Sequence, residues 1–211
     1  MWDIRLSFPG GLGKLVGVID TAEKLADLVP RVRQAEWLAL DTEADSLHAY
    51  PEKLCLVQIS LPGQDILLDP LVGLELSPLL RVLDGRELIL HGADYDLRLL
   101  HRTYGFVPHR VFDTMLAARL VGVSKFSLKD LVVSYLGVKL EKGPQKADWA
   151  RRPLTERMVT YARNDTRYLK PLADILRAEL SRRRRLSWHE QMCAQLVRES
   201  VRTVVEDPDL I

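Results

Sequence analysis

The sequence predicts an α/β or α+β domain built on one sheet, in which strands come early and helices come late. Its 211 residues, 47% of them hydrophobic, are enough to bury a single core. Short apolar runs that are rich in Val, Ile and Leu and bounded by turn-forming residues are typical of buried strands. Because several strand patterns lie close together between residues 37 and 69, we expect at least one antiparallel meander rather than a regular βαβ repeat.

The individual elements follow from these patterns in chain order. The apolar runs predict strands at residues 16–19, 37–41, 54–60, 65–69 and 87–91. Apolar residues at helical spacing predict helices over about 22–34, 75–83, 94–104, 113–121, 127–136, 155–185 and 187–205. Pro171 removes one backbone hydrogen bond from the long helix, so we expect a kink just before it. We assign residues 1–185 to one domain and residues 186–211 to a C-terminal helical extension, a candidate linker to a further helical domain.

The composition indicates the cellular compartment of the protein but does not indicate its binding partner. The formal net charge of +1 argues neither for nor against a nucleic acid, because a local basic patch can hide in a neutral total. Cys55 and Cys193 form neither a disulfide framework nor a metal-ligand spacing, which suits a reducing compartment. The N-terminus lacks a signal-peptide pattern, and no apolar run approaches about eighteen residues. We therefore expect a soluble, cytoplasmic protein without a membrane partner, whose oligomeric state the sequence does not predict.

The stretch LALDTEAD, Leu38 to Asp45, begins as a buried strand and ends in acids. Side chains alternate along a strand, so Asp41 and Glu43 lie on one face. Two carboxylates about 5 Å apart repel each other by roughly 3 kcal/mol at an effective dielectric near 20. We expect a positive partner between them, which is an Arg or Lys, a shared proton, or a divalent metal ion. The alternative is an exposed strand end at which both acids face water.

Further acids fall on helical patterns. Asp165 follows Tyr161 by four residues, so both side chains project from one helix face toward the interior. A buried, ionised Asp is unfavourable without a partner, so either a cation meets Asp165 or that helix face is wetter than its apolar pattern implies. In HGADYDLRLL, we expect Asp94 to be the N-cap of a helix, while Asp96 is better aimed at the core. We expect His91 to be packed and hydrogen-bonded rather than a metal ligand.

Six motifs, taken in order, resemble the 3′→5′ exonucleases of the ribonuclease D group. They are LALDTEAD, YPEKLCLVQIS, HGADYDLRLL, FDTMLAARL, DWARRPLT and YARNDTRYL, and the resemblance runs from about residue 16 to 180. It implies a ribonuclease-H-like exonuclease fold, with a mixed central sheet of about five strands flanked by helices. In that family the site residues lie in D-x-E, in an Asp followed by Leu at the start of a helix, and in Y-x-x-x-D. The matching positions here are Asp41, Glu43, Asp96, Tyr161 and Asp165.

The resemblance implies a catalytic role for all five residues and metal binding by the four acids among them. Two divalent cations, Mg²⁺ or Mn²⁺, are then held about 3.5–4 Å apart over the carboxylates, while Tyr161 orients the attacking water. The expected reaction releases 5′-mononucleotides from the free 3′-OH end of a single-stranded nucleic acid. RNA is favoured, with the trimming of tRNA precursor 3′ ends as the expected role. Two alternatives stay open, a single-strand DNA exonuclease and a catalytically silent domain that binds RNA.

Four polar residues near these motifs are candidates for substrate binding. His48 and Tyr50 follow the first acid pair, so they are candidates for lining the nucleotide pocket. Lys142 and Gln145 come shortly before the helix that carries Tyr161, and we expect them to contact phosphates of the terminal nucleotides.

The remaining polar and aromatic signals are expected to be structural. Trp149 is expected to pack against the domain, and Asp113 to cap the helix that follows it. The run Arg182 to Arg185 is expected to be a solvated helix end, and its functional alternative is a patch that binds phosphates.

Overall fold

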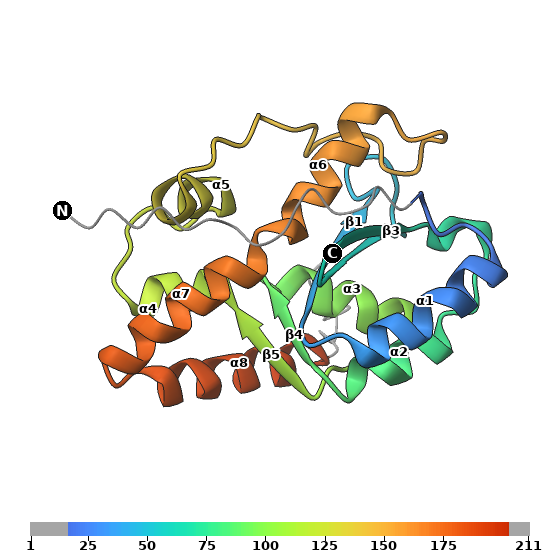
Figure 1. Ribbon diagram of the computed structural model, residues 1–211. Helices are drawn as coiled ribbons and strands as arrows, with labels where there is room; N and C mark the ends of the chain where they lie inside the picture. Colours follow the sequence, from blue (N-terminus) through green and yellow to red (C-terminus); the bar gives the residue numbers. More distant parts are fainter. Residues whose placement is uncertain (1–16, 203–211) are drawn as a thin grey trace, which may run out of the picture.

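The computed structural model describes residues 17–202 and contains a five-stranded mixed sheet with helices on both faces (Figure 1). The strands are β1 (Leu38–Ala44), β2 (Leu54–Leu61), β3 (Gln64–Leu68), β4 (Glu87–Leu90) and β5 (Arg110–Asp113). They are arranged in the order β3-β2-β1-β4-β5. Neighbours among β3, β2 and β1 pair antiparallel, and neighbours among β1, β4 and β5 pair parallel. This arrangement confirms the predicted mixed sheet and its antiparallel meander.

The helices divide between the two faces of the sheet. They are α1 (Ala22–Gln34), α2 (Ser77–Asp84), α3 (Asp94–Tyr104), α4 (Thr114–Leu120), α5 (Leu128–Leu131), α6 (Glu156–Arg167), α7 (Leu169–Arg182) and α8 (Leu186–Ser200), with short 3₁₀ and π segments at Pro70–Val72 and Val132–Leu136. Helices α1, α2 and α3 share a hydrophobic core with Leu38 and Leu40 of β1. On the other face, α4 and α7 pack with Ala39 of β1, and α6 lies over β2 and β3.

The alternation of β1 decides where its acids point. Leu38 and Leu40 belong to the core under α1 to α3, whereas Ala39 belongs to the core under α7. Asp41 and Glu43 continue the series of Ala39, because successive side chains of a strand point to opposite faces. Both acids therefore face α6, at the end of the strand that forms the middle of the sheet.

The strands show two differences from the sequence prediction. The predicted strand at 16–19 is reduced to one bridge between Ile19 and Leu68, and residue 16 lies outside the described residues. Strand β5 was missed, because its four residues are too few to show a periodic pattern. It forms through parallel pairing with β4, in which Leu90 lies opposite Asp113.

The long helix predicted over 155–185 is two helices that meet at Tyr168. The interruption confirms the expected effect of Pro171, which lies in the first turn of α7, where a missing backbone N–H costs little. Because of the break, α6 packs on β2 and β3 while α7 packs on β4 and α4. The last helix ends at Ser200, so the predicted continuation to 205 falls partly outside the described residues.

Helix α8 packs against β5, α3 and α4. Its buried His189 donates from Nε2 to the backbone carbonyl of Asp113 at 2.9 Å, and the His189 ring packs at a tilt against Phe112 with centroids 4.3 Å apart. Residues 186–200 of the predicted extension therefore contribute to the same packed core, while the boundary at residue 185 stays a prediction. Arg182 and Arg183 pair with Glu179, and Arg182 to Arg184 are exposed, which confirms a solvated helix end for these three residues. Arg185 differs, because it is half-buried and donates to the backbone carbonyl of Leu120 at 2.6 Å.

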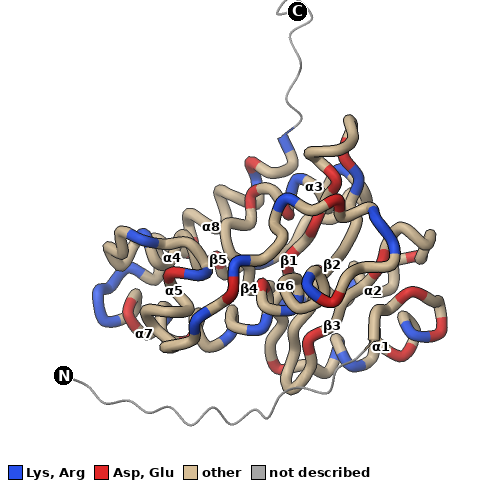
Figure 2. Tube along the Cα trace, turned by 90° about the horizontal axis from the view of Figure 1, so that it is seen from above, with Lys and Arg blue, Asp and Glu red and all other residues tan. Residues whose placement is uncertain are grey.

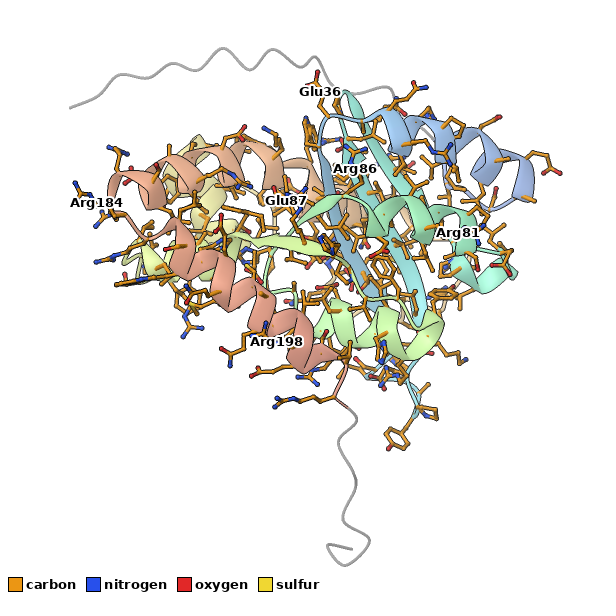
Figure 3. All side chains as sticks on the ribbon, turned by 90° about the horizontal axis from the view of Figure 1, so that it is seen from below. Glu36, Arg81, Arg86, Glu87, Arg184 and Arg198 are labelled. Atoms are coloured by element: carbon orange, nitrogen blue, oxygen red, sulfur yellow. The ribbon has the colours of Figure 1, made fainter. Side chains whose placement is uncertain are left out.

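Arg86, just before β4, and Glu87, its first residue, connect the sheet to its helices and are labelled in Figure 3, which is seen from below. The guanidinium of Arg86 donates to three backbone carbonyls at the C-terminal end of α1. The carboxylate of Glu87 accepts a 2.6 Å bond from Arg177 of α7. Within residues 17–202, no helix is both long enough and apolar enough to cross a membrane.

Candidate active site

The four acids that the family resemblance singled out line one cavity of about 1050 Å³, which lies at the end of β1 beside α6. Three parts of the chain form its wall: the end of β1 with the loop after it, the start of α3, and the segment from α5 to α6. The cavity is lined by the five residues predicted as catalytic, which are Asp41, Glu43, Asp96, Tyr161 and Asp165. In the view of Figure 2, acidic segments lie near β1 and α6, and basic segments of neighbouring loops lie around them.

Strand geometry and one helix bring three of the carboxylates together. Asp41 and Glu43 project from β1 toward α6, and Asp165 projects from α6 toward them. One carboxylate oxygen from each of the three can be chosen so that all lie within 4.8 Å of one another. All three side chains are partly exposed to the cavity, so a small ion has access to them.

The fourth acid reaches the site from the opposite face of the sheet. Thr42, between the two acids of β1, points toward α3, and its hydroxyl donates a 2.5 Å hydrogen bond to Oδ1 of Asp96. Asp96 is buried in the first turn of α3, with 6% of its surface exposed. The three consecutive residues 41–43 therefore organise both halves of the site, because the middle one faces the other way.

Asp113 orders the turn that precedes Asp96. It is the N-cap of α4, as predicted, and its Oδ1 accepts from the backbone N–H groups of Met115 and Leu116 at 2.8 and 3.0 Å. The same carboxylate accepts from the N–H groups just before α3, those of Gly92 at 3.1 Å and Ala93 at 2.8 Å. A buried carboxylate with four N–H donors is well satisfied. The second pair of bonds depends on the pairing of β4 with β5, which the sequence did not reveal.

The prediction that Asp94 caps α3 is wrong. Asp94 is the first helical residue, and Ala93 at the cap position makes no side-chain bond. The exposed carboxylate of Asp94 instead pairs with Arg98 one turn later, at 3.0 Å. His91 is hydrogen-bonded as predicted, because its Nδ1 lies 2.9 Å from the hydroxyl of Thr114, and it also lines the cavity.

Tyr161 lies one helical turn before Asp165 on α6, and both residues line the cavity. Gly143, in the loop before α6, lies directly against the Tyr161 ring. A Cβ atom at position 143 would come within 1.6 Å of Cδ2 of the ring, so a side chain there would displace the tyrosine or the loop. Sequence reasoning missed Gly143, because close approach between a loop and a ring leaves no local pattern.

The loop that precedes α6 is anchored to the sheet. Trp149 is 1% exposed, which confirms that it packs, and its ring lies 6.1 Å from that of Tyr161. The guanidinium of Arg152 donates to the carboxylate of Asp69 at 2.5 and 2.8 Å and to the carbonyl of Cys55 on β2 at 2.7 Å. Planar, bidentate contacts of this kind fix orientation as well as distance. The entry to α6, and with it Tyr161, is therefore held in place.

The predicted substrate residues divide into two groups. Lys142 and Gln145 line the cavity. His48 and Tyr50 are absent from its lining, and the Tyr50 side chain is 89% exposed. The lining also contains Lys146 and residues that the sequence did not suggest, among them Ser46, Leu47, Tyr95, Lys129 and Asn164. The roles of all these residues in binding stay predictions.

Burial is the main cause that raises the pKa of each carboxylate in this cluster. The pKa of Glu43 rises to about 9, with further contributions from the charges of Asp165 and Asp96. The pKa values of Asp96 and Asp165 rise to about 7. The pKa of Asp41 rises well above its usual range, first because its surroundings remove most of its solvation and then because of the charges of the other three acids.

The donor set fits a divalent cation of the hard type. None of the ion pairs among residues 17–202 includes any of the four acids, so Lys or Arg does not neutralise them. Carboxylate oxygens at this spacing are the ligands that Mg²⁺ and Mn²⁺ prefer. Of the positive partners expected from the sequence, the metal ion and the shared proton therefore remain.

Comparison with known proteins gives consistent similarities. Residues 16–181 match a family described as 3′-5′ exonuclease. The chain is 36% identical over 179 residues to a ribonuclease D of Sphingobium indicum, which covers 82% of this chain and 46% of that protein. It resembles the crystal structure of Escherichia coli RNase D, an exoribonuclease involved in structured RNA processing, with a TM-score of 0.83 and 31% identity over 89% of this chain and 51% of the other.

A smaller relative matches over most of its own length. NrnC of Brucella melitensis with bound Mg²⁺ has a TM-score of 0.69 and 28% identity, covering 80% of this chain and 85% of that one. The chain thus spans about half the length of the two ribonuclease D proteins and most of the length of NrnC.

The raised pKa values predict how stability depends on pH when divalent cations are removed. The pKa values of Asp96 and Asp165 in the folded protein, about 7, exceed those of an unfolded chain, about 4. The folded state therefore binds more protons than the unfolded state, and its stability falls as pH rises through these pKa values. We expect the melting temperature in EDTA to fall by several degrees between roughly pH 6.5 and 8.5.

Two controls isolate the acid cluster in this experiment. Saturating Mn²⁺ should weaken or reverse the trend, because cation binding requires deprotonated carboxylates. Asp165→Asn should flatten the EDTA curve, since it removes one titrating group and one source of repulsion. The assignment fails if Asp165→Asn leaves the slope of melting temperature against pH unchanged.

Proposed function

The chain belongs to the 3′-5′ exonuclease family, and on this premise we propose that it is a metal-dependent exonuclease that shortens single-stranded RNA from its 3′ end. The observation that carries the proposal is the set of carboxylate oxygens from Asp41, Glu43 and Asp165 within 4.8 Å, in a cavity that Tyr161 also lines. The names of the ribonuclease D relatives favour RNA over DNA as the substrate. Trimming of tRNA precursor ends in the cytoplasm is the role we propose for the whole protein.

The four acids are proposed to hold two divalent ions, Mg²⁺ or Mn²⁺. Such ions, when bound, stabilise charge on the reacting phosphate and lower the pKa of an attacking water. The chain's own contribution is to hold the carboxylates in place, Asp41 and Glu43 from the rigid central strand and Asp96 through Thr42. The magnesium bound to NrnC supports this assignment by similarity.

Tyr161 is proposed to orient the attacking water rather than to take its proton. Burial and the surrounding carboxylates raise the pKa of its hydroxyl far above the ordinary value, so the group stays protonated at neutral pH. A protonated phenol can both donate and accept a hydrogen bond, which suits a positioning role. Gly143 and Trp149 restrict its ring from the loop side.

The basic wall of the cavity is proposed to receive the RNA backbone. Lys129, Lys142 and Lys146 line the same cavity as the acids and come from α5 and the loop before α6. Lysine ammonium groups bind phosphates without reading the base, so these contacts would position the strand rather than select its sequence. Gln145 adds a neutral donor on the same wall.

Asp165→Asn should abolish release of nucleotides from a 5′-labelled RNA oligonucleotide in Mg²⁺ or Mn²⁺, because it removes one of the clustered ligands. The variant should fold and melt at the same or a higher temperature without metal, because it relieves repulsion. Asp174→Asn on α7 is the matched control, since that carboxylate is 57% exposed and pairs with Lys170. Turnover by Asp165→Asn close to that of the control would contradict the site. The alternative of a catalytically silent domain that binds RNA would then be tested by measuring RNA binding without cleavage.

Tyr161→Phe should lower kcat by roughly 10- to 10³-fold, because it removes one oriented hydrogen bond and leaves every proposed metal ligand in place. Mn²⁺ affinity, measured by calorimetry, should stay close to that of the unaltered protein. The control is Tyr95→Phe, which removes a hydroxyl from another tyrosine of the same cavity. If Tyr161→Phe weakened Mn²⁺ binding and left kcat at saturating metal unchanged, Tyr161 would be structural.

The proposed direction of cleavage requires a free 3′ end. Stepwise release of 5′-mononucleotides is expected from linear RNA with a 3′-OH, with stalling at stable hairpins, because unpairing a base costs a few kcal/mol. A 3′-phosphate should inhibit by bringing more negative charge to the acids. Circular single-stranded RNA of the same sequence should resist the enzyme, and its efficient cutting by pure protein would show an endonuclease. Matched RNA and DNA strands, digested side by side, decide between the two substrates.

A further inference from the structure

The side chain of Gln58 is buried without a partner in the middle of β2. It is 0% exposed, and within the described structure neither its Oε1 nor its Nε2 has a hydrogen-bond partner. A buried amide without partners is unfavourable, and an apolar residue of similar size would avoid that penalty. Its neighbours on the same strand face have no such defect, because Leu56 is apolar and Ser60 bonds both Asp65 and Thr166. Packing alone therefore does not explain a glutamine at this position.

The sheet register places Gln58 beside a proposed metal ligand. In the antiparallel pairing of β1 with β2, Gln58 lies directly opposite Asp41. Directly paired residues project to the same face, with Cβ atoms about 4.5–5.5 Å apart. The partner of Gln58 on the other side is Leu67 of β3, which cannot bond an amide. Of the two cross-strand neighbours of Gln58, Asp41 is therefore the one whose side chain can form a hydrogen bond with the amide.

The position of Gln58 is behind the site rather than in it. Gln58 does not line the cavity, whereas Asp41 does. Leu56 and Leu67, which flank Gln58 on the sheet, pack with Met158 and Ala162 of α6. The amide is therefore enclosed between the sheet and α6, on the side of Asp41 that faces away from the open cavity.

We propose that Gln58 is a positioning residue for Asp41, and that its amide N–H donates to a carboxylate oxygen of Asp41 when that residue binds a divalent cation. This inference rests on the proposed function. A carboxylate that uses one oxygen for a metal is oriented by a donor to the other, and Nε2 of Gln58 is a donor without another partner. The register of β1 and β2 places Gln58 next to Asp41. Rotation about the side-chain bonds of Gln58 then brings its Nε2 to the Asp41 carboxylate.

One other pairing would satisfy Oε1 of the same amide and leave its Nε2 without a partner. Nε1 of Trp149 is also buried without a partner, and Trp149 belongs to the cluster that contains Leu56 and Leu67. A bond from this indole to Oε1 of Gln58 would give the glutamine a structural role without Asp41. The two roles predict different effects on stability and on metal binding.

The test compares Gln58→Leu and Gln58→Met with the unaltered full chain in two measurements. Mn²⁺ affinity is measured by calorimetry, and the unfolding midpoint is measured in urea with EDTA. We expect both variants to bind Mn²⁺ about 10- to 100-fold more weakly, and to unfold at the same or a higher urea concentration, because an unpaired buried amide has been removed.

Two control variants separate positioning from structure. Ser60→Ala alters the same face of β2 two residues away and breaks the bond to Thr166, so it should lower the unfolding midpoint and leave Mn²⁺ affinity within about twofold. Trp149→Phe removes the indole donor and should also leave Mn²⁺ affinity within about twofold. A structural role for the amide with Trp149 would instead lower the unfolding midpoint in Trp149→Phe and in Gln58→Leu alike and leave Mn²⁺ affinity unchanged in both, and this result would overturn the proposal.

The remaining outcomes are also decisive. Unchanged Mn²⁺ affinity in Gln58→Leu and Gln58→Met, or a loss of folding in both, would overturn the positioning role, because the proposal makes the amide dispensable for folding. These results differ from a failure of the proposed function, in which the unaltered protein itself would neither bind Mn²⁺ nor shorten RNA.

Discussion

The repulsion among four enclosed carboxylates is the constraint on which the rest of this structure depends. Asp41, Glu43, Asp96 and Asp165 come from three elements and share one cavity without an ion pair to any of them within residues 17–202. Burial raises the pKa of each, and the charges of other acids in the cluster raise the pKa values of Asp41, Glu43 and Asp165 further. Such a cluster opposes folding unless protons or cations neutralise it. The surrounding fold must therefore hold the acids together against their own electrostatics.

The fold meets this demand with rigid supports on each side. Two acids stand on the central strand, which has a neighbouring strand on both sides. Thr42, which lies between these two acids, points to the opposite face of the sheet and bonds Asp96 there. Asp113 binds the N–H groups before α3 and those at the start of α4, so one buried carboxylate orders two helix starts. Together these supports fix the positions of the acids around the cavity.

Helix α6 connects the acid cluster to the loop that completes the cavity. Its break from α7 at Tyr168 lets α6 lie over β2 and β3, where Asp165 meets the acids of β1. Arg152 ties the preceding loop to Asp69 and to β2, and Gly143 of that loop touches the ring of Tyr161. Acidic and basic walls then face one cavity, an arrangement suited to a phosphate chain that is held by lysines and cut over acids.

The sequence by itself determined the chemistry of the site and the class of the fold. Alternation along LALDTEAD placed Asp41 and Glu43 on one face, and helical spacing placed Tyr161 and Asp165 on another, because both are local consequences of backbone geometry. The ordered motifs identified the family. These signals depend on residues close together in the chain, so they can be read without knowing what packs against them.

Only the tertiary structure decided how distant segments meet. The short strand β5 exists because β4 pairs with it, and this pairing brings Asp113 to the turn before Asp96. Gly143 lies against Tyr161, and Gln58 lies opposite Asp41, through contacts between residues that are far apart in sequence. The loop containing His48 and Tyr50 could not be placed for the same reason. Contacts of this kind leave no periodic trace, because long-range packing and strand register create them rather than local conformational preference.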